Sequence, residues 1–184
     1  MQKFALILPL ACLALGACSK TPDKPQTQAE MASEAKELTK PTPGQYTSKA
    51  ELIEFDVPGL PPEQADQMKK MFAGMGAQEQ SYCLTKEQAD EGFEEAVRKM
   101  GEADKNMDCK FDRFKVEGSQ LDAQMSCDAK GRGKATMTMT GTLESEKQVM
   151  EMHVAQESPQ IPGGKMNIGM KVTSTRTGEC VAAK

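Results

Sequence analysis

The second half of the chain alternates apolar and polar residues with a period of two. The alternation is clearest over 135–143, 148–154 and 165–172, where Met, Ile, Leu or Val alternates with Thr, Glu, Lys or Asn. A period of two is typical of antiparallel strands with one buried face. Turn-like residues, mostly Gly, Ser and Pro, separate the segments. The pattern therefore predicts three consecutive strands of an antiparallel sheet.

A further pair of strands is predicted just before these three. Two alternating segments, one beginning at Cys109 and the other ending at Cys127, flank the loop 117–119, which contains a glycine. Three-residue loops with Gly are common hairpin connections. If Val116 faces Gln120, the same register places Cys109 opposite Cys127 at the open end of the hairpin.

Residues 44–101 predict one strand followed by two helices. The strand covers 45–57 and ends at a proline-rich turn. Apolar residues at helical spacing predict a helix over 63–75. Thr85 and Gln88 fit a capping box that begins a second helix, which Gly101 ends. We therefore expect an α+β, mostly β fold. A curled antiparallel meander sheet of about six strands, shaped like a half-barrel, carries two helices packed against it.

The first 17 residues are predicted to be an export signal. Lys3 supplies a positive charge, and the apolar stretch 4–15 is too short to span a membrane. The stretch ends in Leu15-Gly16-Ala17-Cys18, which looks like the lipobox of bacterial lipoproteins. In that class the cysteine becomes the new N-terminus and carries diacylglycerol and an N-acyl chain such as palmitate. We expect Cys18 to be the lipidation site.

The export signal and the lipobox together predict a lipoprotein of a Gram-negative cell envelope. Ser19, rather than Asp, follows the cysteine, which resembles the sorting pattern for the outer membrane. The expected location is the inner leaflet of the outer membrane, facing the periplasm. Residues 18–43 are rich in Pro, Gln, Lys, Thr and Glu and are expected to form the lipidated cysteine and a disordered tether. A single domain over 44–180 and a tail over 181–184 complete the chain.

Four cysteines remain after the signal and the lipidated residue are set aside. An even number in an oxidising compartment predicts two disulfides, and four cysteines allow three pairings. The hairpin register selects Cys109–Cys127, which leaves Cys83–Cys180. A zinc or copper thiolate site is disfavoured because no C-x-x-C spacing occurs and there is one histidine.

Composition excludes several classes of function. The chain has 184 residues, a net charge of −4, 23 Lys and Arg against 27 Asp and Glu, 14 Met and no Trp. It therefore lacks the clustered positive charge that nucleic-acid binding requires. No nucleophile motif or pairing of Cys with His appears, so we expect no catalytic residue, no cofactor and no enzymatic activity.

Several motifs resemble those of a known family. They are Pro43-Gly44-Gln45-Tyr46, Val57-Pro58-Gly59, Cys83-Leu84-Thr85, Glu87-Gln88-Ala89, Cys109-Lys110-Phe111-Asp112-Arg113-Phe114, Met125-Ser126-Cys127, Ala135–Gly141 and Thr177-Gly178-Glu179-Cys180. In this order they resemble the bacterial domain-of-unknown-function family DUF-3617. The resemblance implies an exported, mostly β domain with paired cysteines, and it implies no activity. Tyr46 departs from the pattern because Trp is expected there, and 174–176 is less basic than usual.

One methionine-rich pattern suggests a metal. Met137 and Met139, with Met150, Met152 and His153, resemble the ligands of copper(I) proteins, because thioethers favour that soft ion. On a strand, however, Met150 and Met152 share one face while His153 points to the other. Core packing accounts for the same pattern, since Met fills irregular gaps well. These five residues are weak copper candidates.

Two main functional hypotheses remain. The chain is either a non-enzymatic structural or interaction module that contacts envelope proteins, or a carrier or sensor of an apolar small molecule in a half-barrel lined by methionine. The expected membrane contact is the N-terminal lipid in both cases. The two differ in whether the space between helices and sheet is filled.

Overall fold

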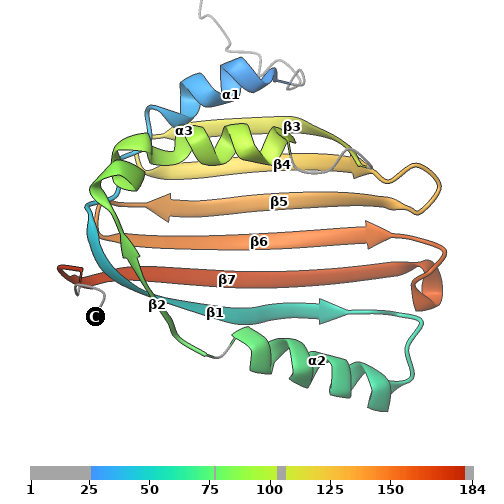
Figure 1. Ribbon diagram of the computed structural model, residues 1–184. Helices are drawn as coiled ribbons and strands as arrows, with labels where there is room; N and C mark the ends of the chain where they lie inside the picture. The colour runs from blue at the N-terminus through green and yellow to red at the C-terminus, as the bar shows by residue number, and fades with distance from the viewer. Residues whose placement is uncertain (1–25, 77, 103–106, 181–184) are drawn as a thin grey trace, which may run out of the picture.

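The computed structural model describes residues 26–76, 78–102 and 107–180 (Figure 1). Its elements, in chain order, are α1 (Gln28–Ala35), β1 (Gly44–Asp56), α2 (Pro62–Gly76), β2 (Gln80–Leu84), α3 (Lys86–Glu102), β3 (Asp108–Glu117), β4 (Gln120–Asp128), β5 (Lys134–Leu143), β6 (Lys147–Glu157), the 3-10 turn η1 (Pro162–Gly164) and β7 (Lys165–Gly178). The predicted signal, Cys18 and the tail 181–184 lie outside the described residues.

The described strands form one antiparallel sheet in the order β2-β1-β7-β6-β5-β4-β3. From β3 to β7 each strand pairs with the next one along the chain, and β1 then pairs with β7. The sheet is curled and does not close. The expected mostly β meander is confirmed, and all six predicted strands are present. Sequence analysis missed β2, a short exposed strand that shows no apolar alternation.

The β3–β4 hairpin corrects the predicted loop. Glu117 pairs with Gln120, so the connection is the two-residue loop Gly118-Ser119 and not a three-residue loop. This difference shifts the tip of the hairpin by one residue relative to the expected register. Taken alone, the shift would have moved the two hairpin cysteines out of opposition.

A β-bulge restores the expected register further along the hairpin. The register changes between Phe111 and Arg113, where β3 contains one residue more than β4. Beyond the bulge Cys109 faces Cys127, and the two form a disulfide with a Cα–Cα distance of 4.0 Å. The expected pair is therefore present, although the loop that suggested it was wrong.

The sheet buries its apolar face mainly at β3, β4 and β5. Val97 of α3 and two residues of α1 pack against this part of the sheet. The buried cluster consists of Met31, Ala35, Leu38, Val97, Phe111, Phe114, Leu121, Ala123, Met139 and Leu143. Figure 1 shows α3 crossing in front of β3 and β4, with α1 beyond the β3 edge. The core is thus a layer of helix on one half of a sheet.

The structure corrects the expected tether. Residues 26–43 belong to the folded domain, because α1 begins with a capping box between Thr27 and Glu30 and buries Met31 and Ala35. Leu38 follows in the same cluster. These three apolar residues have the i, i+4, i+7 spacing of one helix face, which the polar composition of the segment hides. The prediction of disorder up to residue 43 is therefore wrong from residue 26 onward.

The N-terminal segment also covers an edge of the sheet. The side-chain oxygen Oε1 of Gln26 accepts a hydrogen bond from the backbone amide of Phe114 at 2.6 Å. The same side chain donates to Glu34 Oε1 at 2.9 Å. Since an open edge exposes unpaired backbone groups, this contact and α1 protect the β3 edge.

The two expected helices are present as α2 and α3. The predicted capping box of α3 is confirmed, because the Gln88 amide donates to Thr85 Oγ1 at 3.2 Å and the Thr85 amide donates to Gln88 Oε1 at 3.0 Å. The helix is kinked at Gly92. Phe72 of α2 packs against Phe55 of β1 with ring centroids 5.7 Å apart. Among the described residues, no helix combines the length and the apolar character needed to cross a bilayer.

We expect Met31→Ala to lower the free energy of unfolding by about 2–5 kcal/mol, because a buried methionine is truncated in the core. Ser33→Ala, an exposed position on the same helix, is the matched control and should change stability little. Urea denaturation of both variants tests the correction. Equal midpoints for the two variants would show that α1 does not belong to the core.

Candidate functional site

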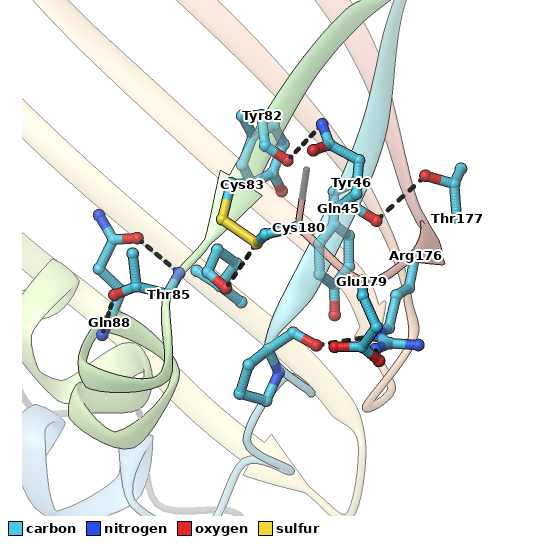
Figure 2. Close-up of a disulfide and its surroundings, with 12 residues drawn as sticks. Gln45, Tyr46, Tyr82, Cys83, Thr85, Gln88, Arg176, Thr177, Glu179 and Cys180 are labelled. Atoms are coloured by element: carbon cyan, nitrogen blue, oxygen red, sulfur yellow. Dashed lines mark hydrogen bonds and ion pairs between the residues drawn. A yellow bond between two sulfur atoms is a disulfide. The ribbon is translucent and has the colours of Figure 1, made fainter. Parts of the chain in front are cut away.

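Four of the eight family-like motifs meet at one corner of the sheet (Figure 2). A disulfide between Cys83 of β2 and Cys180, two residues beyond β7, joins segments 97 residues apart with a Cα–Cα distance of 5.4 Å. The pair expected by elimination is therefore present. In the chain-entropy model, closing a loop of this length contributes up to about 4.7 kcal/mol. The disulfide fixes the end of the sheet to the start of α3.

Tyr46 is the buried centre of this corner. Its side chain is completely buried, and its hydroxyl donates to the Thr42 carbonyl oxygen at 2.7 Å. The hydroxyl also lies 3.0 Å from the Ser145 carbonyl oxygen in the β5–β6 turn. Its ring stacks on Tyr82 of β2 with a centroid distance of 5.6 Å. Burial, and to a smaller extent the neighbouring Tyr82, raises the pKa of Tyr46 above its usual value of 10.0.

Arg176 holds the two ends of β1 and β7 together. Its side chain is only 16% exposed, and its Nε donates to the Pro43 carbonyl oxygen at 2.8 Å. The guanidinium also pairs with Glu179 and lies 3.7 Å from Glu146. Gly44 is required here because a Cβ at that position would lie 2.5 Å from Arg176 Nε. The Pro-Gly motif thus makes room for the arginine.

The corner is built to hold the fold. Its contacts include the disulfide, the hydrogen bond of the buried Tyr46 hydroxyl and the hydrogen bond from Arg176 to Pro43, and each of these connects segments that are distant in sequence. Within the described ranges, no group of three or more His, Cys, Asp or Glu is placed to hold a metal ion. We therefore assign the corner a structural role.

The structure separates the five copper candidates. Met139 and Met152 pair directly across β5 and β6, and Met137 and Met150 pack on the same face. His153 points to the opposite, polar face of the sheet. The alternation along β6 therefore removes the one nitrogen ligand from the methionines.

His153 instead pairs with a carboxylate that sequence reasoning missed. Its Nδ1 lies 2.8 Å from Glu54 Oε2, although the two residues are 99 positions apart. Gly169 of β7 lies between them, and a Cβ there would be 2.8 Å from the Glu54 Cβ and 3.0 Å from His153 Nδ1. A lone glycine inside an alternating strand signals such a close approach. Both side chains of the pair are 43% exposed.

The apolar face is only partly buried over the two central strands β6 and β7. We define the open apolar face as six residues in three cross-strand pairs: Met150 with Val172, Met152 with Met170, and Val154 with Ile168. None of the six reaches full burial, whereas Met139 and Leu143 on the neighbouring β5 do. Along β6, these apolar residues have the same intermediate burial as the polar residues of the opposite face.

The position of the helices explains this exposure. The core that α3 joins lies over β3 to β5, while α2 packs mainly on β1 at the other side of the same face (Figure 1). The end of α2 approaches the face at Gly76, where a Cβ would lie 2.9 Å from the Ala50 carbonyl oxygen and 3.4 Å from Met170 Cε. The described helices therefore cover the two margins of the apolar face and leave its middle only partly buried.

The raised pKa of Tyr46 predicts a loss of stability in alkaline solution. Below pH 10 the phenol is neutral in both states, so its contribution is fully present. As the pH rises from 10 through the higher pKa of the folded state, the unfolded chain ionises first and the contribution is lost. In urea denaturation between pH 8 and about pH 11, Tyr46→Phe should flatten this decline, and Tyr82→Phe is the control that should retain most of it, because burial is the larger cause of the raised pKa. An unchanged decline in Tyr46→Phe would contradict the assignment.

Comparison with known proteins agrees with the motifs at this corner. A family model described as "Protein of unknown function (DUF3617)" matches residues 41–180. The match covers all seven described strands together with α2 and α3, and it begins after α1. No curated protein matches the chain. No solved structure matches it either. The chain therefore belongs to the DUF3617 family of proteins of unknown function.

Proposed function

We propose that this protein is a lipid-anchored, non-enzymatic component of the cell envelope that works by binding an apolar partner. The observation that carries the proposal is the open apolar face, whose six residues are contiguous and only partly buried. Soluble proteins seldom leave a contiguous apolar patch uncovered unless it serves an interaction. The face is thus the binding surface.

The chemistry of the face favours binding over catalysis. The six side chains are three methionines, two valines and one isoleucine, and none of them ionises. Methionine is unbranched and polarisable, so it adapts to occupants of different shape. Of the two hypotheses from the sequence, the apolar carrier or sensor gains support from this accessibility. An envelope protein that presents an apolar surface is the alternative occupant.

Copper(I) binding loses support for a geometric reason. A site built from Met150 and Met152 would have to rely on thioethers alone, because His153 is on the other face and bonded to Glu54. The exposed middle of the face also extends to Val154, Ile168 and Val172, which offer no ligand atom. An apolar occupant uses the whole face, whereas a metal ion would use part of it.

The anchor would hold this domain close to the membrane. Only seven residues separate Cys18 from Gln26, the first described residue, which contacts β3. Eight residues span at most about 30 Å when fully extended. In our proposal the lipid on Cys18 therefore keeps the folded domain at the periplasmic surface of the outer membrane. The connection is short because residues 26–43, which were expected to be part of the tether, belong to the folded domain.

Cys18→Ser should release the protein from the membrane fraction, because the acyl chains are the proposed anchor. Cys12→Ser is the matched control, since Cys12 lies inside the predicted signal and should not affect anchoring. Fractionation of both variants tests the proposal. Membrane association of Cys18→Ser at the level of Cys12→Ser would refute the lipid anchor.

An uncharged, environment-sensitive dye such as Nile red should bind the open apolar face. For this test the chain from Ser19 onward is exported behind an ordinary cleavable signal. Met170→Gln keeps the length of the side chain but adds an amide, and it should weaken dye binding about tenfold or more. Met71→Gln, at a methionine that is 56% exposed on α2, is the matched control.

Thermal unfolding of both variants checks that they remain folded. If Met170→Gln does not fold, Val172→Thr replaces it because that side chain has nearly the same shape. The proposed binding surface would be refuted if the unmodified protein does not bind the dye. It would also be refuted if Met170→Gln and Met71→Gln bind the dye equally.

A further inference from the structure

A row of uncharged polar side chains crosses the sheet at one end of the open apolar face. Gln148 of β6 pairs with Ser174 of β7, and Ser174 pairs with Ser48 of β1. We call these three residues the polar row. The pair Met150 and Val172 of the open apolar face follows two positions along the strands, about 7 Å away. Because side chains alternate along a strand, the polar row and this apolar pair are on the same face.

The polar row can donate hydrogen bonds to a ligand. The Ser174 hydroxyl donates to Ser48 Oγ at 3.0 Å, and Ser174 is only 7% exposed. A bond between two hydroxyls uses one of their two protons, so the other can be donated to a ligand. Ser48 and Gln148 are less buried than Ser174, and the Gln148 amide offers two more donors and one acceptor. The polar row therefore suits hydroxyl and carbonyl oxygens.

The surroundings of the polar row favour a ligand without charge. Of the residues that the described strands β1, β5, β6 and β7 place on this face, only Arg176 is charged. Its guanidinium already pairs with Glu179 and lies 3.7 Å from Glu146. A carboxylate or phosphate would therefore leave water without gaining a cation from these strands, which is costly. An uncharged head group avoids this cost.

The apolar strip beside the polar row has the length of an acyl chain. Apolar residues continue along β7 from Val172 to Met166, which is about 20 Å at the rise of a strand. One leaflet of a bilayer holds acyl chains in about 15 Å, half of its hydrocarbon thickness. A chain of that length fits along β7 when its head group lies at the polar row.

A hydrocarbon chain fits this face better than a protein surface does. Interfaces between proteins carry about one hydrogen bond per 100–200 Å² and are anchored by Tyr, Trp and Arg. The open apolar face has none of these anchors and no side-chain donor or acceptor among its six residues. A chain without polar groups loses no hydrogen bond when it binds there.

We infer that the open apolar face binds a single-chain neutral lipid, such as a monoacylglycerol. The acyl chain lies along β6 and β7 from Val172 toward Met166, and the uncharged head group contacts Ser48 and Gln148. The inference rests on the proposed function and deepens it, because it names the chemical class of the apolar partner. A glycerol ester supplies the hydroxyl and carbonyl oxygens that the polar row can bind, and it brings no charge to the face.

The test compares two lipids that share one acyl chain and differ in the charge of the head group. The chain from Ser19 onward, exported behind an ordinary cleavable signal, is incubated with monooleoylglycerol or with oleate. Bound lipid is measured by native mass spectrometry. We expect monooleoylglycerol to bind about fivefold more tightly or better, because the carboxylate of oleate gains no cation at the polar row.

Two glutamines at opposite ends of β6 locate the head group. Gln148→Met removes the amide of the polar row with little change in size, and it should weaken monooleoylglycerol binding about fivefold. Gln156→Met is the matched control, because Gln156 is on the same face of β6, is also half-buried and lies at the far end of the strand. Nile red binding should stay unchanged in both variants. If Gln148→Met does not fold in a thermal melt, Ser48→Ala replaces it.

The outcomes separate this inference from the proposed function. If oleate binds as tightly as monooleoylglycerol, or if Gln148→Met binds monooleoylglycerol like Gln156→Met, the uncharged head site is wrong while the open apolar face stands. Dye binding without lipid binding likewise overturns the lipid and leaves the open apolar face in place. A dimer that Met170→Gln dissociates would identify a second copy as the occupant and would also overturn the lipid. If neither dye nor lipid binds, both proposals fail.

Discussion

An antiparallel sheet whose strands alternate in polarity has one apolar face, and that face must be covered by something. In this protein the face extends across six strands, from β3 to β1, while the described helices cover only its margins. The helices α1 and α3 complete a buried core with β3 to β5, and α2 packs on β1 through Phe72 and Phe55. The mismatch between the width of the sheet and the reach of the helices creates the open apolar face.

The corner at Tyr46 explains how the uncovered half of the sheet remains ordered. Apart from the packing of α2 on β1, strands β1 and β7 are not stabilised by a helix over their length, but their ends are fixed by the Cys83–Cys180 disulfide and by the hydrogen bond from Arg176 to Pro43. The hydroxyl of Tyr46 adds a connection to the β5–β6 turn. These contacts replace, at one end of the strands, the stabilisation that burial would have supplied along their length. The fold thus keeps β6 and β7 in place without covering them.

Regular patterns of residue types made much of this fold predictable from the sequence. Period-two alternation located six strands, and the hairpin and cysteine count gave both disulfides. Elements without such a pattern were not predicted: β2 is short and exposed, and the polar segment 26–43 contains three core residues, two of them in α1. The residue types around Asp112 did not indicate the β-bulge. The open apolar face could not be predicted either, because alternation tells which side chains face inward but not whether a helix covers them.

The apolar face has two regions: a covered region that stabilises the fold and an open region that is accessible for binding. The cluster around Phe114 and Leu143 is closed by α1 and α3 and does not depend on an occupant at β6 and β7. Met150 and Met152 connect the two regions, since they pack against that cluster while remaining partly exposed. A ligand on the open apolar face would therefore extend an existing core and meet side chains already held on one side. Because these side chains are already ordered, the protein would lose little conformational entropy when a ligand binds, which favours binding.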